Sequence, residues 1–388
     1  MKKLYLLEPD DPGPAWMPWS GARPIAELRA GAFRIWERWK RALDADQVVV
    51  VSSHTPSFAD VDSLPQVALA DVQGPAIVAR STFAPVARSV GLPAGVKGIS
   101  SQGVTIAWVL GTGDRWNGPN EVVDPFEIRG LKLAGAFDLV TACERMLEDD
   151  CAAARDELSA AVPPASVVLG DPASVVALTA SVEPHVVFDV RKGPIVLEPD
   201  SVVRAGTRLE GPLWVGRHSW LLGGAIRGSA IGPHCRVHGE VSATVFLGYA
   251  NKSHDGFLGH SVVGQWSNLG AGTITSNLKN TYGEVRLDLP GIRLPTGRTN
   301  LGTLFGDHAK TAIGSLLPTG TVVGTGANVI GGSIPKYVRP FAWTAAGPER
   351  LDRDRFLTIA GRVMPRRGVD LTPEIVASLS ALHARMTR

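Results

Sequence analysis

An apolar residue occurs at every sixth position through much of the second half of the chain. The pattern runs over 197–221, 257–269 and 305–329, and small residues commonly stand four places after each apolar one. A fixed period of this kind is typical of a solenoid, whose coils bury their apolar residues against the coils above and below. The hexads therefore predict a parallel β-helix of short strands and tight turns. A sandwich of short strands is the alternative, but it needs no such period.

The hexads are interrupted twice before they end. They slip in phase over 225–245, and an insertion rich in Gly, Pro and basic residues separates two runs over 275–300. After residue 335 the repeat stops, and the pattern predicts helices over 348–364 and 372–386. We expect these helices to pack as a cap, because a solenoid needs one at an open end.

Before residue 150, apolar residues form short continuous runs between polar or helical stretches, and such runs are typical of buried strands. The sequence predicts these strands at 3–7, 47–52, 75–79 and 104–110. An apolar face at helical spacing predicts a helix over 25–43, and a second helix over 137–161 ends before Pro163 and Pro164. This alternation indicates an open α/β domain. We expect three parts, namely an α/β domain over 1–162, a β-helix over 163–340 and a helical cap over 341–388.

Composition narrows the class of protein. The chain has 388 residues, enough for two or three domains with real cores, and 44% of them are apolar. Its 43 Gly and 28 Pro suit a turn-rich solenoid rather than a disordered chain. A formal net charge of +2 gives no electrostatic reason to expect a nucleic acid partner.

Cysteine usage and the apolar runs bear on the compartment. Cys143, Cys151 and Cys235 are odd in number and widely spaced, which favours a reducing environment over a disulfide framework or a zinc cluster. The apolar run that follows Met1 is too short for a signal peptide, and no run of 18 apolar residues is available to span a membrane. We expect a cytoplasmic protein without a membrane partner.

One coil breaks the hexad rule. Over 251–256 the chain reads NKSHDG, where aliphatic and small residues are expected, and rule-breaking inside a consistent repeat is expected at functional sites. The neutral imidazole of His254 is suited to act as a general base. The turn Gly270-Ala271-Gly272 is suited to offer backbone N–H groups to a developing oxyanion. A structural role for a lone histidine is the alternative.

The same stretch resembles a known family. Residues 245–277, which include NKSHDGFLG and NLGAGT, are similar to the acetyltransferase half of the bacterial bifunctional N-acetylglucosamine-1-phosphate uridyltransferase/glucosamine-1-phosphate acetyltransferase. With RPIAELRAG over 23–31, the closer resemblance is to an alternative branch of sugar nucleotidyltransferases. The resemblance implies a left-handed β-helix and a homotrimer with acetyl-transfer sites between neighbouring helices. It also implies two transferase activities that make UDP-N-acetylglucosamine, a cell wall precursor.

The resemblance assigns substrates and roles. Acetyl-CoA would be the co-substrate that acetylates the amine of glucosamine-1-phosphate, with His254 as the catalytic residue, and UTP with Mg²⁺ would then supply the nucleotide. The residues implied to bind the sugar phosphate are Asn251, Lys252, Phe257, Asn268 and Asn277, and those implied to line the coenzyme A groove are Ala271 and Gly331. An exposed Lys252 on a solvated rim is the alternative for that residue, and Phe257 stands where the better-known branch has a tyrosine.

The chain departs from the family in both halves. No Gly-rich phosphate loop follows the first predicted strand, and Ser242 stands where the familiar enzymes have a basic residue near the sugar phosphate. Because helix N-termini and the carboxyl ends of strands attract phosphates, Arg23 and Arg29 are the candidates to bind a triphosphate. Surface pairing of these arginines with Glu27 is the alternative. Asp114 is the candidate Mg²⁺ ligand.

Other functions remain open at this point. The first domain could bind a nucleotide without transferring it, which would leave an acyltransferase alone. A non-catalytic scaffold would need neither a polar coil nor a coenzyme groove. A metal-dependent hydratase on the same solenoid would need three histidines that converge on zinc, and the candidates are His234, His238, His254, His260 and His308.

Overall fold

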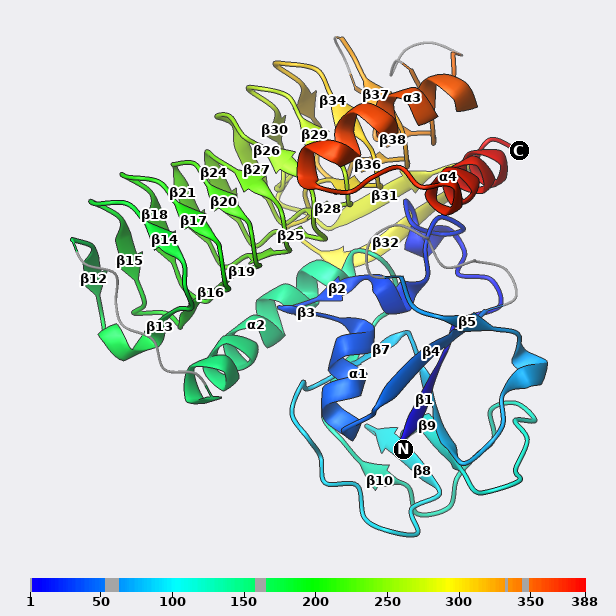
Figure 1. Cartoon of the computed structure of the whole chain (residues 1–388). Coiled ribbons are helices and arrows are strands. Elements are labelled where there is room, and N and C mark those ends of the chain that lie inside the picture. Colours follow the sequence, from blue (N-terminus) through cyan, green and yellow to red (C-terminus); the bar gives the residue numbers. More distant parts are fainter. Residues whose placement is uncertain (1, 53–62, 158–164, 332–333, 344–348) are drawn as a thin grey trace.

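The computed structural model describes residues 2–52, 63–157, 165–331, 334–343 and 349–388. An α/β part and a long β-solenoid lie side by side, with one helix between them and two helices at the C-terminus (Figure 1). Within these residues, no helix combines the length and apolar character needed to cross a bilayer. The mixed α/β fold followed by a parallel β-solenoid confirms the predicted fold class, and the solenoid is consistent with the left-handed β-helix that the resemblance implies.

The first part is built on a seven-stranded mixed sheet with the order β10-β8-β9-β6-β1-β4-β5. Its strands are β1 (Lys3–Leu7), β4 (Gln47–Val51), β5 (Gln66–Val67), β6 (Ala76–Arg80), β8 (Gly98–Ser101), β9 (Val104–Leu110) and β10 (Phe126–Glu127). The central strand β1 pairs in parallel with β4 and β6, whereas β9 runs antiparallel to β6 and β8. Four of these strands lie where the apolar runs predicted them, because those runs supply the buried core of the sheet.

The helix predicted over 25–43 is wrong in its first half. The chain there forms a short 3₁₀ turn, a hairpin and then a helix, namely η2 (Ile25–Glu27), β2 (Arg29–Ala30), β3 (Phe33–Arg34) and α1 (Ile35–Leu43). The carboxylate of Glu8 accepts hydrogen bonds from the backbone N–H groups of Ile25 and Ala26 at 2.8 and 3.0 Å, which holds the first turn in place. Gly31 then turns the hairpin at φ +63°. Tertiary contacts thus override the helical spacing.

The solenoid has three parallel faces, which we name in chain order. The first face contains β12 (Val167–Leu169), β15 (Val187–Asp189), β18 (Arg208–Glu210), β21 (Ala225–Arg227), β24 (Glu240–Ser242) and β27 (Phe257–Gly259). The second contains β13 (Val175–Ala177), β16 (Ile195–Leu197), β19 (Leu213–Val215), β22 (Ala230–Ile231), β25 (Val245–Phe246), β28 (Val262–Val263), β33 (Leu304–Phe305), β36 (Val322–Val323) and β38 (Tyr337–Val338). The third contains β14 (Ser181–Val182), β17 (Val202–Val203), β20 (Trp220–Leu221), β23 (Arg236–Val237), β26 (Asn251–Lys252), β29 (Asn268–Leu269), β34 (Lys310–Thr311) and β37 (Asn328–Val329).

The interior of the solenoid follows the hexads. Val203 and Leu221 pair on neighbouring coils and are three hexads apart in the sequence. The next partners in this column, Val237 and Lys252, follow at shorter intervals. This shortening is the predicted phase slip. The repeat continues one strand beyond its predicted end, because β38 still pairs with β36. Two strands beside the first face, β30 (Ile274–Thr275) and β35 (Leu316–Leu317), pair with each other and flank the insertion.

The insertion forms an antiparallel hairpin of β31 (Val285–Leu289) and β32 (Ile292–Arg298). Its base is tied to the helix α2 (Asp138–Glu157), because Arg298 donates hydrogen bonds to Thr141 at 2.6 Å and to Glu144 at 2.8 Å. The remaining elements before the C-terminal helices are β7 (Phe83–Pro85), β11 (Gly130–Lys132), η1 (Pro14–Trp16), η3 (Leu69–Asp71) and η4 (Pro172–Ser174).

The α/β part and the solenoid share one hydrophobic core. The helix α2 lies along the second face (Figure 1), and outward residues of that face, among them Trp214 and Val245, are buried with it. The ring of Phe33 packs edge-on against Trp214 with centroids 5.1 Å apart. Pro163 and Pro164, where a linker was predicted, lie outside the described residues. The predicted boundary between residues 162 and 163 would therefore separate the α/β part from the second face of the solenoid, although these two surfaces bury each other.

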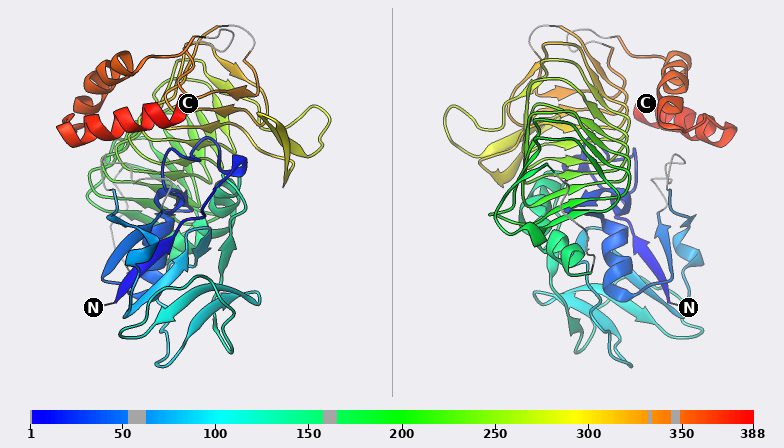
Figure 2. Two further views of the ribbon diagram at one scale, coloured as in Figure 1. Left: turned by 90° about the vertical axis from the view of Figure 1, so that its right-hand side faces the viewer. Right: turned by 60° about the vertical axis from the view of Figure 1, so that its left-hand side comes forward.

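The C-terminal helices cover a flank of the solenoid rather than only its end (Figure 2). They are α3 (Arg353–Val363), η5 (Met364–Arg367) and α4 (Pro373–Met386). Phe356 and Leu379 are buried against Tyr249, Trp266 and Phe341 in one cluster. The predicted helices are thus confirmed, and they extend beyond the open end of the solenoid, because their apolar sides find a partner along the corner of the coils.

That corner, between the second and third faces, carries a stack of rings. Each ring belongs to a residue with φ between 54 and 61°, and the successive centroid distances are 4.8, 4.6, 4.4 and 6.2 Å. The stack consists of His218, His234, Tyr249, Trp266 and His308. Burial lowers the pKa of His234 to about 4 and that of His308 well below its usual value, so both imidazoles stay neutral in the stack near pH 7.

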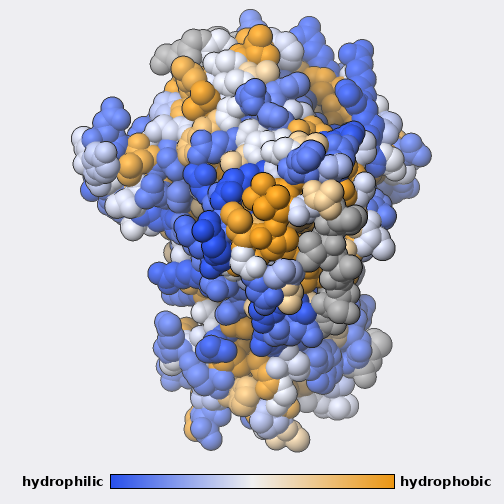
Figure 3. All heavy atoms as spheres, turned by 90° about the vertical axis from the view of Figure 1, so that its left-hand side faces the viewer, coloured by the Kyte–Doolittle hydropathy of each residue, from blue (hydrophilic) through white to orange (hydrophobic). Residues whose placement is uncertain are grey.

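The opposite end of the solenoid begins at β12 to β14. Its first coil leaves Val168, Ala177 and Val182 only partly buried. Figure 3 shows hydrophobic side chains gathered in one area of this side of the molecule, next to residues drawn in grey.

Candidate functional site

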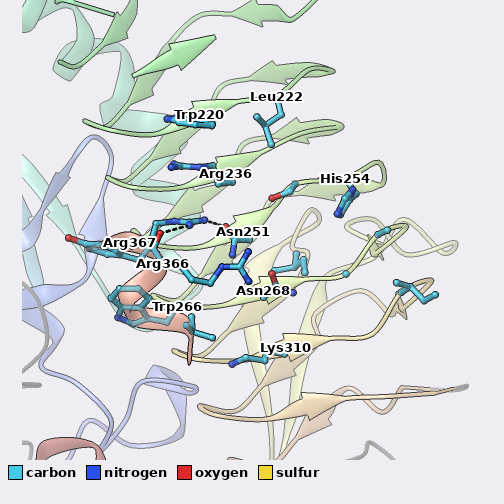
Figure 4. Close-up of a pocket in the computed structure, with 17 residues that line it drawn as sticks. Trp220, Leu222, Arg236, Asn251, His254, Trp266, Asn268, Lys310, Arg366 and Arg367 are labelled. Atoms are coloured by element: carbon cyan, nitrogen blue, oxygen red, sulfur yellow. Dashed lines mark hydrogen bonds between the residues drawn. The ribbon is translucent and has the colours of Figure 1, made fainter. Parts of the chain in front are cut away.

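A cavity of about 710 Å³ lies on the outside of the third face, under the segment η5 (Figure 4). Its floor is a column of outward residues, one from each successive strand, which the parallel register places above one another. The column consists of Trp220, Arg236, Asn251, Asn268 and Lys310. Strand spacing in a sheet is about 4.7–4.9 Å, so Arg236 and Lys310 lie about 14 Å apart along the floor.

His254 lies on the rim of this cavity, at the corner where the chain passes from β26 on the third face to β27 on the first. Its side chain is exposed, and Figure 4 shows it on the side of the cavity opposite Arg367. Asn251, Asn268 and Ala271 line the same cavity. The structure therefore brings the predicted base together with three of the residues predicted to bind substrate or coenzyme.

Lys252 does not join them. It occupies an inward position in the column of Val237 and is only 1% exposed, so its ammonium does not reach the cavity. The ammonium donates hydrogen bonds to the carbonyl oxygens of His238 at 3.0 Å and His254 at 2.7 Å. Burial lowers its pKa to about 8. Both expectations for Lys252, a phosphate contact and an exposed rim residue, are corrected, and its role is to hold the backbone of the His254 turn.

Phe257 and Asn277 lie on the other side of that corner. Phe257 begins β27 on the first face, and a side chain added at Gly259 would collide with both Phe257 and Asn277. The amide of Asn277 is 2.8 Å from Nδ1 of His260. Gly331 is exposed and does not line the cavity. The predicted residues are therefore divided between two faces that meet at His254.

A second histidine lies within that first-face group. Nε2 of His260 is 3.4 Å from one carboxylate oxygen of Glu144. The other oxygen of Glu144 forms an ion pair with Arg298. Burial lowers the pKa of His260, although the charge of Glu144 opposes this shift. The group joins the solenoid, α2 and the base of the hairpin.

The predicted oxyanion-binding turn is only partly available. The N–H of Gly270 donates to Thr311, and the N–H of Gly272 donates to the carbonyl of Asp255 at 3.0 Å. Within the described residues, the N–H of Ala271 has no hydrogen-bond acceptor. Ala271 is thus the donor of this turn that remains for a developing oxyanion.

Sequence reasoning missed four basic residues that line the cavity. They are Arg236, Lys310, Arg366 and Arg367. No Asp or Glu is present among the described residues that line it. Burial lowers the pKa of Arg236 to about 10 and that of Lys310 to about 8. Arg236 and Lys310 precede inward hexad positions, so counting the outward column would have found them, whereas Arg366 and Arg367 depend on where the C-terminal segment docks.

Arg23 is buried at the joint between the two parts and does not face a triphosphate site. Its Nε donates to Asp307 at 2.8 Å, one terminal nitrogen donates to Gln265 at 2.8 Å, and the other donates to Glu27 at 3.2 Å. The predicted pairing with Glu27 is present, but in the interior instead of at the surface. Each nitrogen of the Arg23 guanidinium already donates a hydrogen bond. The expected role of Arg23 is therefore corrected: it joins the two parts of the chain and does not bind a nucleotide.

Arg29 is also buried, and it faces a different cavity of about 420 Å³ at the same joint. One terminal nitrogen donates to the carbonyl of Ala32, and burial lowers the pKa of the guanidinium. Arg34, Arg41 and Arg217 line this cavity too. Arg29 therefore remains the better placed of the two nucleotide candidates.

The structure gives Asp114 a local role. Its carboxylate accepts a hydrogen bond from the N–H of Gly111 at 2.6 Å in the exposed turn after β9. Among the described residues, no group of three or more His, Cys, Asp or Glu is placed to hold a metal ion. A zinc site of three histidines therefore does not fit the described residues, and Asp114 would have to bind Mg²⁺ without a cluster of other protein ligands.

Comparison with known proteins agrees with the motifs. A bifunctional sugar-1-phosphate nucleotidylyltransferase/acetyltransferase from Sulfurisphaera tokodaii is 29% identical over 151 residues, which are 37% of each chain. Two bifunctional proteins named GlmU, from Methanocaldococcus jannaschii and Methanococcus vannielii, are 31% and 30% identical over 86 and 95 residues, or 22% and 24% of this chain. No family model matches the chain.

The matched segments span 37%, 21% and 23% of these relatives, so the similarity covers little more than a third of their length at most. All three relatives have names that combine two activities or call the protein bifunctional. The relationship that the sequence motifs indicated is confirmed to this extent: part of the chain is similar to these bifunctional proteins.

Proposed function

We propose that the chain transfers an acetyl group from acetyl-CoA to the amine of an amino-sugar 1-phosphate, with glucosamine-1-phosphate as the first candidate. The observation that carries this proposal is the position of His254 on the rim of a cavity that also holds Asn251, Asn268 and Ala271. The curated relatives whose names include acetyltransferase or GlmU support it.

The cavity supplies what this reaction needs. The amine nitrogen attacks the thioester carbon, the new C–N bond forms, and the C–S bond breaks to release the coenzyme thiolate. His254 takes the proton that the amine loses and returns it to the thiolate, so the protons balance. The N–H of Ala271 is our candidate donor to the oxyanion, and Asn251 and Asn268 are our candidates to orient a sugar hydroxyl, because all three residues line the cavity.

The second activity, nucleotidyl transfer from UTP to the acetylated sugar phosphate, is the less supported half of the proposal. The Arg29 cavity, which four arginines line together with Glu37 and Glu198, is our candidate site for the triphosphate. Mg²⁺ would be needed to neutralise that triphosphate, and Asp114 is not among the residues that line this cavity. We further propose a cytoplasmic homotrimer that shares its acetyl-transfer sites between neighbours and makes UDP-N-acetylglucosamine.

One assay tests both halves. Purified protein is incubated with sugar 1-phosphates, acetyl-CoA, and UTP or dTTP with Mg²⁺, and the release of thiol and of pyrophosphate is measured separately. Thiol release that depends on an amino-sugar phosphate supports acetyl transfer. Pyrophosphate release without thiol release would leave nucleotidyl transfer alone, and the absence of both would overturn the proposal.

We also propose that Lys310 contacts a phosphate of acetyl-CoA, so the affinity for acetyl-CoA should fall as the pH rises through about 8. Burial lowers the pKa of Lys310 to about 8, so its ammonium is charged below that pH and neutral above it, where a contact with phosphate is lost. Calorimetry at pH 7 and 9.5 without acceptor measures this change. Lys310→Arg keeps its charge over the range and should flatten the profile, whereas identical profiles for both proteins would remove Lys310 from the coenzyme site.

A further inference from the structure

Three arginines gather at one end of the cavity on the third face. Arg236 comes from β23, and Arg366 and Arg367 come from η5, which the C-terminal segment places over that face. Figure 4 shows all three on the same side of the cavity, across from His254. Arg236 is separated from Arg366 and Arg367 by more than a hundred positions along the chain, so the three arginines form a group only in the folded protein.

Neutral groups hold Arg236 and Arg367 in place, whereas Arg366 is exposed. Arg367 donates to the side-chain oxygen of Asn251 at 2.6 Å and to the carbonyl of His234 at 3.3 Å. Arg236 donates to the carbonyls of His218 and Cys235 at 2.9 Å and lies over the ring of Trp220 at 4.2 Å. In the part of the chain that the structure describes, no carboxylate forms an ion pair with any of the three.

Like charges kept together without a counter-ion are costly when they are partly buried. Burial and the mutual repulsion of Arg236 and Arg367 both act to lower the pKa of Arg236. The arrangement is stabilised when an anion enters, because guanidinium groups bind phosphate oxygens through paired, charge-assisted hydrogen bonds. A bound anion would thus supply the negative charge that this cluster of arginines lacks.

We propose that Arg236, Arg366 and Arg367 bind the phosphate ester that one of the two substrates of acetyl transfer carries. This rests on the proposed function, and it assigns the cluster to a phosphate monoester or diester rather than to an uncharged sugar. The cluster supplies on the third face the positive charge that Ser242, on the first face, does not. Along the floor of the cavity, Arg236 lies about 14 Å from Lys310, and the coil that carries His254 lies between their coils.

Calorimetry with Arg236→Gln, Arg366→Gln and Arg367→Gln tests the proposal. The ligands are glucosamine-1-phosphate against glucosamine, for the acceptor, and acetyl-CoA against acetyl-pantetheine, for the donor. We expect each variant to weaken one phosphate-bearing ligand by about 10–100-fold and to leave its phosphate-free counterpart unchanged. The pair that responds identifies which substrate carries the phosphate.

Arg353→Gln is the matched control, because Arg353 lies on the same C-terminal segment, is exposed and pairs only with its neighbour Asp354 in the described structure. Unchanged affinity for both phosphate-bearing ligands in all three variants would overturn the proposal, and so would an equal loss for the phosphate-free ligands. A wild-type protein that transfers acetyl groups while its variants bind normally would refute this inference and spare the proposed function. A wild-type protein that binds phosphate esters through these arginines but transfers no acetyl group would support this inference and refute the proposed function.

Discussion

Replacing His254 with alanine is expected to lower the rate of acetyl transfer by about 10²–10⁴-fold, the usual loss when a general base is removed. Stability should not change, because the side chain is exposed and its ring makes no hydrogen bond within the described residues. The contact that fixes this turn involves the backbone carbonyl of His254, which Lys252 still binds in the variant. Thiol release from acetyl-CoA measures the rate, and thermal unfolding measures the stability.

His185→Ala is the control for this experiment, because His185 is also exposed and also belongs to the solenoid, but lies in an early coil far from the cavity. It should keep the full rate. If the His254 variant retains more than about a tenth of the starting rate, the loss is below the range for a general base and His254 has another role.

Arg23→Ala is expected to destabilise the folded chain by about 3–5 kcal/mol, the cost of breaking a buried ion pair by removing one partner. Asp307 would be left as a buried carboxylate without its guanidinium. Glu27 would also lose a charge that opposes the effect of burial, which already raises its pKa to about 7. Denaturant unfolding of the wild type and the variant measures the difference, and Arg298→Ala, whose pair with Glu144 is partly exposed, should cost less.

The same variant decides between two roles for Arg23. Calorimetry with UTP and Mg²⁺ should give equal affinity for the wild type and Arg23→Ala if the arginine only joins the two parts. A specific loss of UTP affinity with unchanged stability would restore the nucleotide role and contradict the assignment made from the structure. Arg23→Lys separates charge from shape, because a lysine cannot donate to Asp307, Gln265 and Glu27 at once through a planar fork.

The solenoid was predictable because its period arises from contacts between successive coils. Each inward residue, such as Val203 or Leu221, must meet its counterpart on the next coil, so the sequence repeats the spacing of the structure. The first part lacks such a constraint. The helix expected over 25–43 fails because the carboxylate of Glu8, distant in the chain, fixes the turn at Ile25 and Ala26.

The site was predictable in part for the same reason. Asn251, His254, Asn268 and Ala271 belong to consecutive coils, and the register of those coils brings them to one cavity. Lys252 was misplaced because the shortened coils shift it to an inward position, which the polar character of a lysine argues against. The docking of Arg366 and Arg367 depends on the packing of the C-terminal helices and leaves no periodic trace in the sequence.

Each of the three corners of the solenoid carries a different structural feature. The turn of His254 occupies the corner between the third and first faces, the hairpin of β31 and β32 leaves the coils between the first and second faces, and the ring stack closes the corner between the second and third. A coil can therefore gain residues at the hairpin corner while the rings stay aligned and the histidine keeps its place. This makes the hairpin corner the place where such a protein can acquire new segments, and the ring corner the place where successive coils stay aligned although their lengths differ.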